Sequence, residues 1–214
     1  MTVAVDVRGH GDSTKLEKPS SIKEFAEDLH YLLRELGFDE VVLMGHSMGG
    51  MISMQYALDH PDHVKGLILV STTPRSGGHL KYYLLYFLAK LKLVSYEKLL
   101  AKTLRKMFHP STPKETVEWA IEDMLRTSLE DFMKITKSIK GFDITYRLEE
   151  IRQPTLIIVG KKDSVTPLDR SRLLRAKIPN SRLVIIEECD HTVILDRPER
   201  VADETVKFLE EINY

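Results

Sequence analysis

Ten residues at positions 41–50, VVLMGHSMGG, decide the fold. The apolar run Val41–Met44 predicts a buried strand, and a helical pattern follows over residues 48–60. Ser47 stands in the turn between them, with a glycine two residues away on either side. A tight strand-to-helix turn leaves no room for Cβ atoms at those two places. The stretch therefore predicts a serine on a strained turn, which is the G-x-S-x-G arrangement of a nucleophile.

The same turn puts the start of a helix beside the serine. The first N–H groups of a helix have no partner within it and form the positive end of its dipole. We expect the N–H of Met48 to stabilise the oxyanion that forms when Ser47 attacks a carbonyl group. We expect His46, inside the turn, to line the substrate pocket rather than to remove a proton. A glycine-rich turn with a merely structural serine is the alternative interpretation.

Strand and helix patterns alternate along much of the chain. Ser21 and Glu24 form a capping-box pattern for a helix over residues 21–36, and a last helix is predicted over residues 198–212. Continuous apolar runs suit a parallel sheet that is covered on both faces. The alternation predicts an α/β fold with a doubly wound, mostly parallel sheet. The five predicted strands are Val3–Val7, Glu40–Met44, Leu67–Val70, Thr155–Val159 and Leu183–Ile186.

Residues 76–146 interrupt the alternation. They contain helical patterns without a strand pattern, and they are far too numerous for a loop between two strands. We expect a helical lid above the carboxyl ends of the strands, where ligands bind in open α/β sheets. Residues 1–75 and 147–214 would then form the core. Apolar side chains at helical spacing in the lid, Leu84 and Phe87 among them, either line an acyl pocket or pack the lid onto the core.

Two polar residues follow the last two predicted strands. Asp163 comes after the fourth strand and His191 after the fifth, so both lie at the sheet edge where Ser47 is expected. The chain order serine, acid, histidine is the one that this kind of serine turn requires. We predict that Asp163 orients His191, that His191 takes the serine proton, and that Val165 contacts the substrate. The alternatives are a turn aspartate that bonds its own backbone and a surface histidine.

Composition excludes several classes of protein. The chain has 214 residues, of which 43% are hydrophobic and 29% charged, and its net charge of −1 argues against nucleic-acid binding. Its single cysteine, Cys189, permits neither an intramolecular disulfide nor a cysteine metal cluster. Without a signal-peptide pattern or an apolar run of about 18 residues, we expect a cytoplasmic protein without membrane contact.

A second histidine-rich stretch, His60-Pro61-Asp62-His63, suggests a metal pair. It follows a predicted helix and contains a proline, so we expect it to end that helix at the protein surface. The sequence therefore predicts no metal site, and the serine chemistry requires no cofactor.

Four motifs together resemble the α/β-hydrolase superfamily, in its serine esterase and monoacylglycerol-lipase-like branch, over essentially the whole chain. The resemblance implies the same roles for Ser47, Asp163 and His191. It departs at the start, because family members carry three further strands before the first motif, and the loop after the third supplies a second oxyanion donor. The motifs are Asp6-Val7-Arg8-Gly9-His10-Gly11-Asp12-Ser13, Gly45 to Gly50, Gly160-Lys161-Lys162-Asp163, and Asp190-His191 with Arg197-Pro198-Glu199.

This departure allows two interpretations. The chain begins at an internal methionine of a longer protein, or the sheet closes up without the missing strand. In the second case an apolar sheet face would be uncovered, which favours a homodimer. The N–H groups of the loop at residues 9–11 would then replace the missing oxyanion donor.

The sequence therefore predicts a hydrolase that cleaves carboxylic esters or lactones through an acyl-enzyme intermediate. The expected substrate is a small molecule with an apolar acyl group. Hydrolysis of a carbon–carbon bond or an amide by the same residues is one alternative. A catalytically silent binding protein, without the oxyanion strand, is another.

Overall fold

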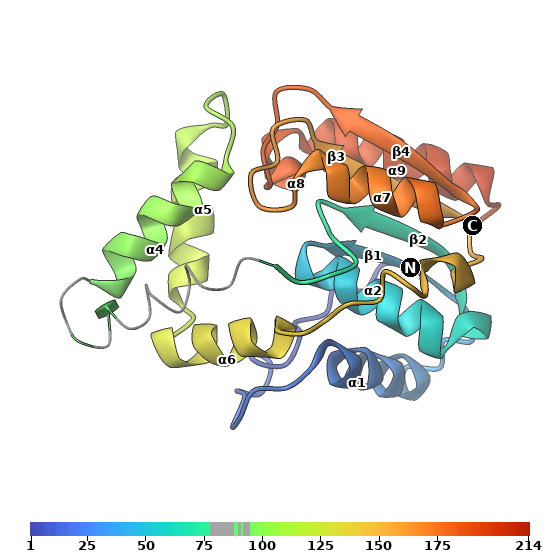
Figure 1. Cartoon of the computed structure of the whole chain (residues 1–214), viewed down its shortest axis with the longest axis horizontal. Helices are drawn as coiled ribbons and strands as arrows, with labels where there is room; N and C mark the ends of the chain where they lie inside the picture. Colours follow the sequence, from blue (N-terminus) through green and yellow to red (C-terminus); the bar gives the residue numbers. More distant parts are fainter. Residues whose placement is uncertain (78–87, 90, 92–94) are drawn as a thin grey trace.

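The computed structural model describes residues 1–77, 88–89, 91 and 95–214 of the chain. Within these residues four parallel strands form one sheet, in the order β1-β2-β3-β4 (Figure 1). The register pairs His46 with Val70 and Gly160 with Ile186, so the carboxyl ends of neighbouring strands lie level. The strands are β1 (Val41–His46), β2 (Val64–Val70), β3 (Thr155–Gly160) and β4 (Ser181–Ile186).

Helices cover both faces of this sheet, which confirms the doubly wound α/β fold. α2 (Met48–Asp59) packs on β1 and β2, α7 (Leu168–Lys177) packs on β3 and β4, and α1 (Ile22–Glu35) packs on α2. α8 (Val193–Asp196) and α9 (Pro198–Glu211) cover the other face. Each large aliphatic side chain buried between these layers contributes about 1.5–3 kcal/mol.

The sheet is buried at its centre and open at its edges. β3 is buried along its whole length and β2 along almost all of it, as the continuous apolar runs predict. β1 and β4 are edge strands, and the side chain of Met44 is 49% exposed. The prediction of a buried strand is therefore wrong for one face of β1 and for most of β4, because each has a neighbouring strand on one side only.

The predicted strand Val3–Val7 is wrong. These residues have no regular secondary structure, and Val3 and Val5 are 43% and 38% exposed. A strand is stabilised by hydrogen bonds to a neighbouring strand. In the described part of the chain no strand pairs with this segment, so its apolar alternation alone does not make it one.

The caps of α1 confirm the helix that the sequence predicts. The Ser21 hydroxyl accepts a hydrogen bond from the N–H of Glu24, at 3.1 Å, and the helix ends before Gly37, whose φ is 75°. An N-cap serine contributes about 1 kcal/mol to helix stability. Glycine adopts the left-handed conformation after the helix without the strain that a Cβ atom brings.

The segment between β2 and β3 contains several helices in its described part, and they stand beside the sheet (Figure 1). An isolated antiparallel bridge between Arg75 and Asp143 holds the two ends of this segment side by side. We call residues 76–146 the insertion. Its described helices are α4 (Tyr96–Leu104), η2 (Arg105–Met107), α5 (Lys114–Leu125) and α6 (Leu129–Ile139). The remaining short helices are η1 (Pro61–His63) and η3 (Leu148–Glu150).

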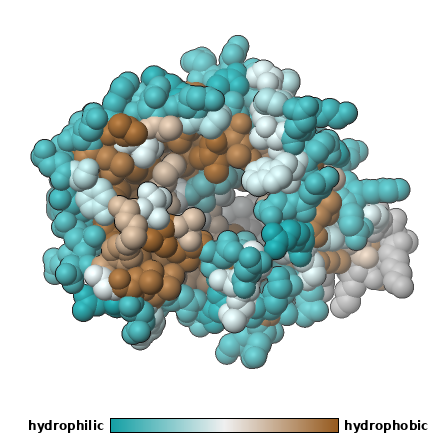
Figure 2. All heavy atoms as spheres, turned by 180° about the vertical axis from the view of Figure 1, so that it is seen from behind, coloured by the Kyte–Doolittle hydropathy of each residue, from teal (hydrophilic) through white to brown (hydrophobic). Residues whose placement is uncertain are grey.

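Apolar side chains gather in several patches on the rear of the molecule, around a hollow (Figure 2). None of the helices in the described ranges has both the length and the apolar character needed to cross a bilayer.

Three histidines and a tyrosine form a cluster where α1, α2 and η1 meet. The rings of His30 and His60 stack with their centroids 3.7 Å apart. The Tyr56 hydroxyl lies 3.2 Å from Nδ1 of His30 and also contacts Nδ1 of His63. Nε2 of His63 donates to the carbonyl oxygen of Phe38, at 2.6 Å. The prediction that residues 60–63 lie at the surface is therefore wrong for His63, which is 8% exposed.

We expect this cluster to make the fold sensitive to acid. Burial, together with the nearby His60 and His63, lowers the pKa of His30 below its ordinary value of 6.5. The folded state thus resists a proton that the unfolded chain accepts near pH 6.5, so stability falls as the pH drops below that value. We expect the His30→Gln variant to lose less unfolding free energy than the wild type between pH 7.5 and 5.5, measured by urea unfolding. An equal loss in both proteins would contradict this role for His30.

Candidate active site

Ser47 is held in a strained backbone conformation between β1 and α2. Its φ is 52° and its ψ is −114°, outside the regions that residues with a Cβ atom normally occupy. Such strain costs about 1–3 kcal/mol. The N–H of Ser47 donates to the carbonyl oxygen of Val70 at 3.0 Å, and the Thr72 hydroxyl donates to the Ser47 carbonyl oxygen at 2.6 Å. These bonds to β2 and the residues after it hold the turn in place.

The glycines around Ser47 do not have equal importance. A Cβ atom on Gly45 would lie 2.3 Å from the backbone of Gly49, which no real contact allows. A Cβ atom on Gly50 would lie 2.7 Å from the Thr72 side chain. A Cβ atom on Gly49 would meet nothing within 4 Å. The predicted need for glycine on both sides of the serine therefore holds for Gly45 and not for Gly49.

The structure brings Ser47, His191 and Asp163 together in one row. Nε2 of His191 lies 3.1 Å from Oγ of Ser47, and Nδ1 lies 3.1 Å from both carboxylate oxygens of Asp163. An ionised carboxylate only accepts hydrogen bonds, so Nδ1 of His191 carries the proton. Nε2 is then free to accept the proton of the serine hydroxyl.

The carboxylate of Asp163 is buried and fully hydrogen-bonded. It accepts from the N–H of Val165 at 3.0 Å, and from the N–H and the hydroxyl of Thr166 at 2.7 and 2.8 Å. Burial raises the pKa of Asp163, but the hydrogen bonds from His191 and Thr166 outweigh it, and the net pKa lies below its ordinary value. Asp163 is therefore ionised near neutral pH.

Thr166 is a further member of the site that the sequence motifs do not single out. Its hydroxyl contacts Asp163 and lies 3.4 Å from Nδ1 of His191. The signal was present, because an aspartate three residues before a threonine, just ahead of a helix, is a pattern in which the carboxylate accepts nearby N–H groups. Val165 has an exposed side chain, and its described contact with the row is the N–H bond to Asp163. Leu84 and Phe87 lie outside the described residues.

His46 supports the backbone of His191. Its Nε2 donates to the carbonyl oxygen of His191, at 2.9 Å. Burial and the neighbouring imidazole of His191 lower the pKa of His46 to about 4, so its ring is neutral at physiological pH. The role of His46 in the pocket wall stays a prediction, and its bond to the His191 backbone is a contact that the sequence pattern did not reveal.

Met48 is the first residue of α2, directly after Ser47. An N–H at this position has no acceptor within its own helix, so it is available to an oxyanion at the serine. The loop at residues 9–11 is a poor source of further donors. The N–H of Gly9 bonds to Thr14 and that of His10 bonds to Val7, each at 2.8 Å. The expectation that this loop offers its N–H groups is therefore wrong for both of these residues.

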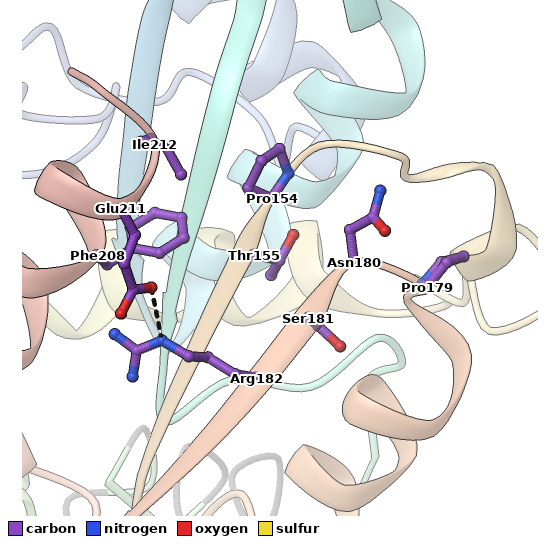
Figure 3. Close-up of a pocket in the computed structure, with 9 residues that line it drawn as sticks. All are labelled: Pro154, Thr155, Pro179, Asn180, Ser181, Arg182, Phe208, Glu211 and Ile212. Atoms are coloured by element: carbon purple, nitrogen blue, oxygen red, sulfur yellow. Dashed lines mark ion pairs between the residues drawn. The ribbon is translucent and has the colours of Figure 1, made fainter.

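A hollow of about 250 Å³ lies at the opposite end of the sheet from the row (Figure 3). It is bounded by the starts of β3 and β4 and by the end of α9, and an ion pair between Arg182 and Glu211 crosses it at 3.3 Å. Because Ser47, Asp163 and His191 follow the carboxyl ends of the strands, this hollow has no part in their chemistry.

The described residues support neither a metal site nor a cysteine nucleophile. No three side chains of the histidine, cysteine, aspartate or glutamate type are grouped so as to hold a metal ion there. Burial raises the pKa of Cys189 to about 11, so its thiol is protonated and is not a nucleophile.

The chain is similar to known proteins over nearly all of its length. Residues 2–198 match a family model described as the alpha/beta hydrolase fold. The chain is 30% identical to a 2-hydroxy-6-oxononadienedioate/2-hydroxy-6-oxononatrienedioate hydrolase of Burkholderia vietnamiensis, covering 97% of this chain and 75% of that protein. It is 28% identical to the sn-1-specific diacylglycerol lipase of Mus musculus, covering 97% of this chain and 71% of that protein.

A similar structure is that of a thermophilic esterase from Thermogutta terrifontis. Its TM-score is 0.85 at 25% sequence identity, over 98% of this chain and 79% of that one. The match extends over nearly all of the chain.

The unequal roles of the two glycines give a paired test of the turn. We expect Gly45→Ala to lower the unfolding free energy by about 3 kcal/mol or more, because its Cβ atom would collide with backbone. Gly49→Ala has open space at the first turn of a helix, and we expect no loss, or a gain of about 0.5–1 kcal/mol. Urea unfolding of both variants measures the difference. Equal stability of the two would show that the turn does not depend on close backbone approach at Gly45.

Proposed function

The chain belongs to the alpha/beta hydrolase fold family, and on this basis we propose that it is a serine hydrolase that cleaves carboxylic esters, with lactones as cyclic members of the same class. One observation carries the proposal. Asp163, His191 and Ser47 form an unbroken row of hydrogen bonds, with 3.1 Å at both junctions. A hydroxyl, an imidazole and an ionised carboxylate in this order are what nucleophilic catalysis by serine requires.

The proposed reaction has two halves. Nε2 of His191 takes the proton of Ser47 while Oγ attacks the ester carbonyl, and the N–H of Met48 stabilises the oxyanion. The carboxylate of Asp163 stabilises the imidazolium of His191, which then gives its proton to the departing alcohol. Water attacks the acyl-serine with His191 again as base, so the acid is released and Ser47 is restored.

The names of the relatives support an ester as the substrate class. A lipase and an esterase are among the proteins that the chain resembles over more than nine-tenths of its length. The insertion lies between β2 and β3, and we propose that it acts as the lid over the row. An apolar acyl group is the substrate feature that this arrangement favours, since apolar residues are frequent in its sequence.

Cleavage of a carbon–carbon bond beside a ketone is the second candidate. It is favoured by the relative that is named for a 2-hydroxy-6-oxo substrate, at 30% identity. The same row serves both reactions, so the substrate separates them. A panel of an ester, a lactone, an amide and a diketone, assayed at equal concentration, ranks the candidates by kcat/KM.

The nucleophile is tested by replacing Ser47 with alanine. We expect Ser47→Ala to abolish hydrolysis of p-nitrophenyl butyrate and covalent labelling by a fluorophosphonate, because both need Oγ. Intact mass measures the adduct. Ser53→Ala is the matched control, because its hydroxyl belongs to the same helix and bonds the carbonyl oxygen of Gly49 instead. Labelling of the Ser47 variant would refute the proposal, and a folded wild type without any adduct would favour a catalytically silent protein.

The role of Asp163 predicts a large effect on turnover. In Asp163→Asn, the amide offers an N–H to Nδ1 of His191 and favours the tautomer whose Nε2 is already protonated. We expect kcat for p-nitrophenyl butyrate to fall by about 10⁴-fold, with little change in the unfolding temperature. Asp169→Asn, at an exposed carboxylate on α7, is the control and should keep wild-type turnover. A small loss in the Asp163 variant would contradict its role as the orienting acid.

A further inference from the structure

Asp196, at the end of α8, is a buried carboxylate that joins two separate parts of the chain. It is 4% exposed. From the insertion it accepts the hydroxyl of Thr112 at 2.6 Å and the N–H of His109 at 3.3 Å. From the residues just before His191 it accepts the N–H of Asp190 at 3.0 Å. Its donors therefore come from two stretches of the chain, residues 109–112 and residue 190, that are far apart in the sequence.

Further bonds reinforce this connection. The N–H and the hydroxyl of Thr192 both donate to the carbonyl oxygen of Met107, at 3.2 and 2.9 Å. The guanidinium of Arg197 contacts the hydroxyl of Ser111 at 2.9 Å and the carboxylate of Glu188 at 3.3 Å. Residues 107–112 of the insertion are thus bonded to both sides of His191.

The Asp190 side chain links these contacts to His191, because it accepts a hydrogen bond from the His191 backbone. Oδ1 of Asp190 accepts the N–H of His191 at 2.8 Å, and also the N–H and hydroxyl of Ser164 at 2.9 and 2.8 Å. Asp196 fixes the backbone of Asp190, and Asp190 fixes the backbone of His191. Ser164 follows Asp163 directly in the chain, so the same contacts set the distance between the imidazole and its orienting carboxylate.

We propose that Asp196 is a positioning residue that makes the orientation of His191 depend on the docking of residues 107–112. This inference rests on the proposed serine chemistry. If residues 107–112 move away, Asp196 loses the donors from His109 and Thr112. A buried carboxylate without its hydrogen bonds is costly, so it shifts toward other donors. That shift pulls on Asp190 and turns His191 out of line with Ser47.

Turnover is therefore coupled to the position of the insertion. The hydrogen bonds between Asp163, His191 and Ser47 are then intact only while residues 107–112 are docked. The protein therefore reacts with a substrate that lies beneath the docked insertion. Small displacements are sufficient for this coupling, since about 1 Å of misplacement can lower a rate by about 100-fold.

The hydrogen bond between Thr112 and Asp196 is best removed by replacing Thr112. Replacement of the buried Asp196 would endanger folding. Thr112→Val removes the 2.6 Å hydrogen bond and keeps the shape of the side chain. Thr112→Ser keeps the hydroxyl and serves as the rescue. Thr136→Val is the matched control, because Thr112 and Thr136 are both 7% exposed and the Thr136 hydroxyl bonds within its own helix, to the carbonyl oxygen of Phe132.

The first readout is turnover of p-nitrophenyl acetate, which is too small to need an acyl pocket. We expect Thr112→Val to lower kcat about 10–100-fold with KM within about twofold, and to slow fluorophosphonate labelling of Ser47 by a similar factor. Thr112→Ser and Thr136→Val should stay within about threefold of the wild type. A change in KM alone would overturn the inference, because it would mean that the insertion only binds substrate.

The second readout does not depend on activity. We expect the amide protons of residues 188–192 to exchange with deuterium faster in Thr112→Val than in Thr136→Val or the wild type, because the bond that holds the Asp190 N–H is weakened. Equal exchange and equal labelling rates in all variants would overturn the inference while the proposed function stands. If the wild type neither hydrolyses esters nor labels, the proposed function fails, and unequal exchange alone then tests the connection between the insertion and residues 188–192.

Discussion

The left-handed backbone of Ser47 is the constraint on which the rest of the site depends. A residue with a Cβ atom avoids φ near 52°, and the turn persists because Val70 and Thr72 hold its N–H and carbonyl oxygen. Gly45 permits the close approach of the following helix. If this turn relaxed, the hydroxyl would leave the reach of His191, and the N–H of Met48 would no longer face the same point.

Parallel pairing of the strands completes the site. Because neighbouring strands end level, the loops after β1, β3 and β4 meet at one edge of the sheet. Ser47 and His191, which are 144 residues apart in the sequence, therefore lie with Oγ and Nε2 3.1 Å apart. Two buried carboxylates then stabilise the loop of His191 from different directions. Asp163 bonds its imidazole, and Asp196 bonds the backbone beside it. The hydrolase chemistry and the insertion are thereby joined through one short loop.

The features that the sequence predicts correctly are those with a local cause. The strand, glycine turn and helix over residues 41–50 are encoded within ten positions, and the Ser21 cap is encoded within four. Asp163 and His191 come after β3 and β4, and the apolar runs of these two strands are visible in the sequence. The strand predicted at Val3–Val7 fails because a strand also requires a neighbour, which an apolar run cannot supply.

What the chain encodes locally is thus the order of strands and helices, the serine turn, and the sheet edge at which Ser47, Asp163 and His191 lie. The burial of His63, the support from His46 and Thr166, and the donors around Asp196 arise only when the elements pack. Each of these contacts joins polar atoms whose partners are set by three-dimensional distance, and hydrogen bonds over a few ångströms leave no periodic trace in the sequence. Local patterns place the serine turn and the residues that follow the strands, whereas packing determines which neighbours hold them.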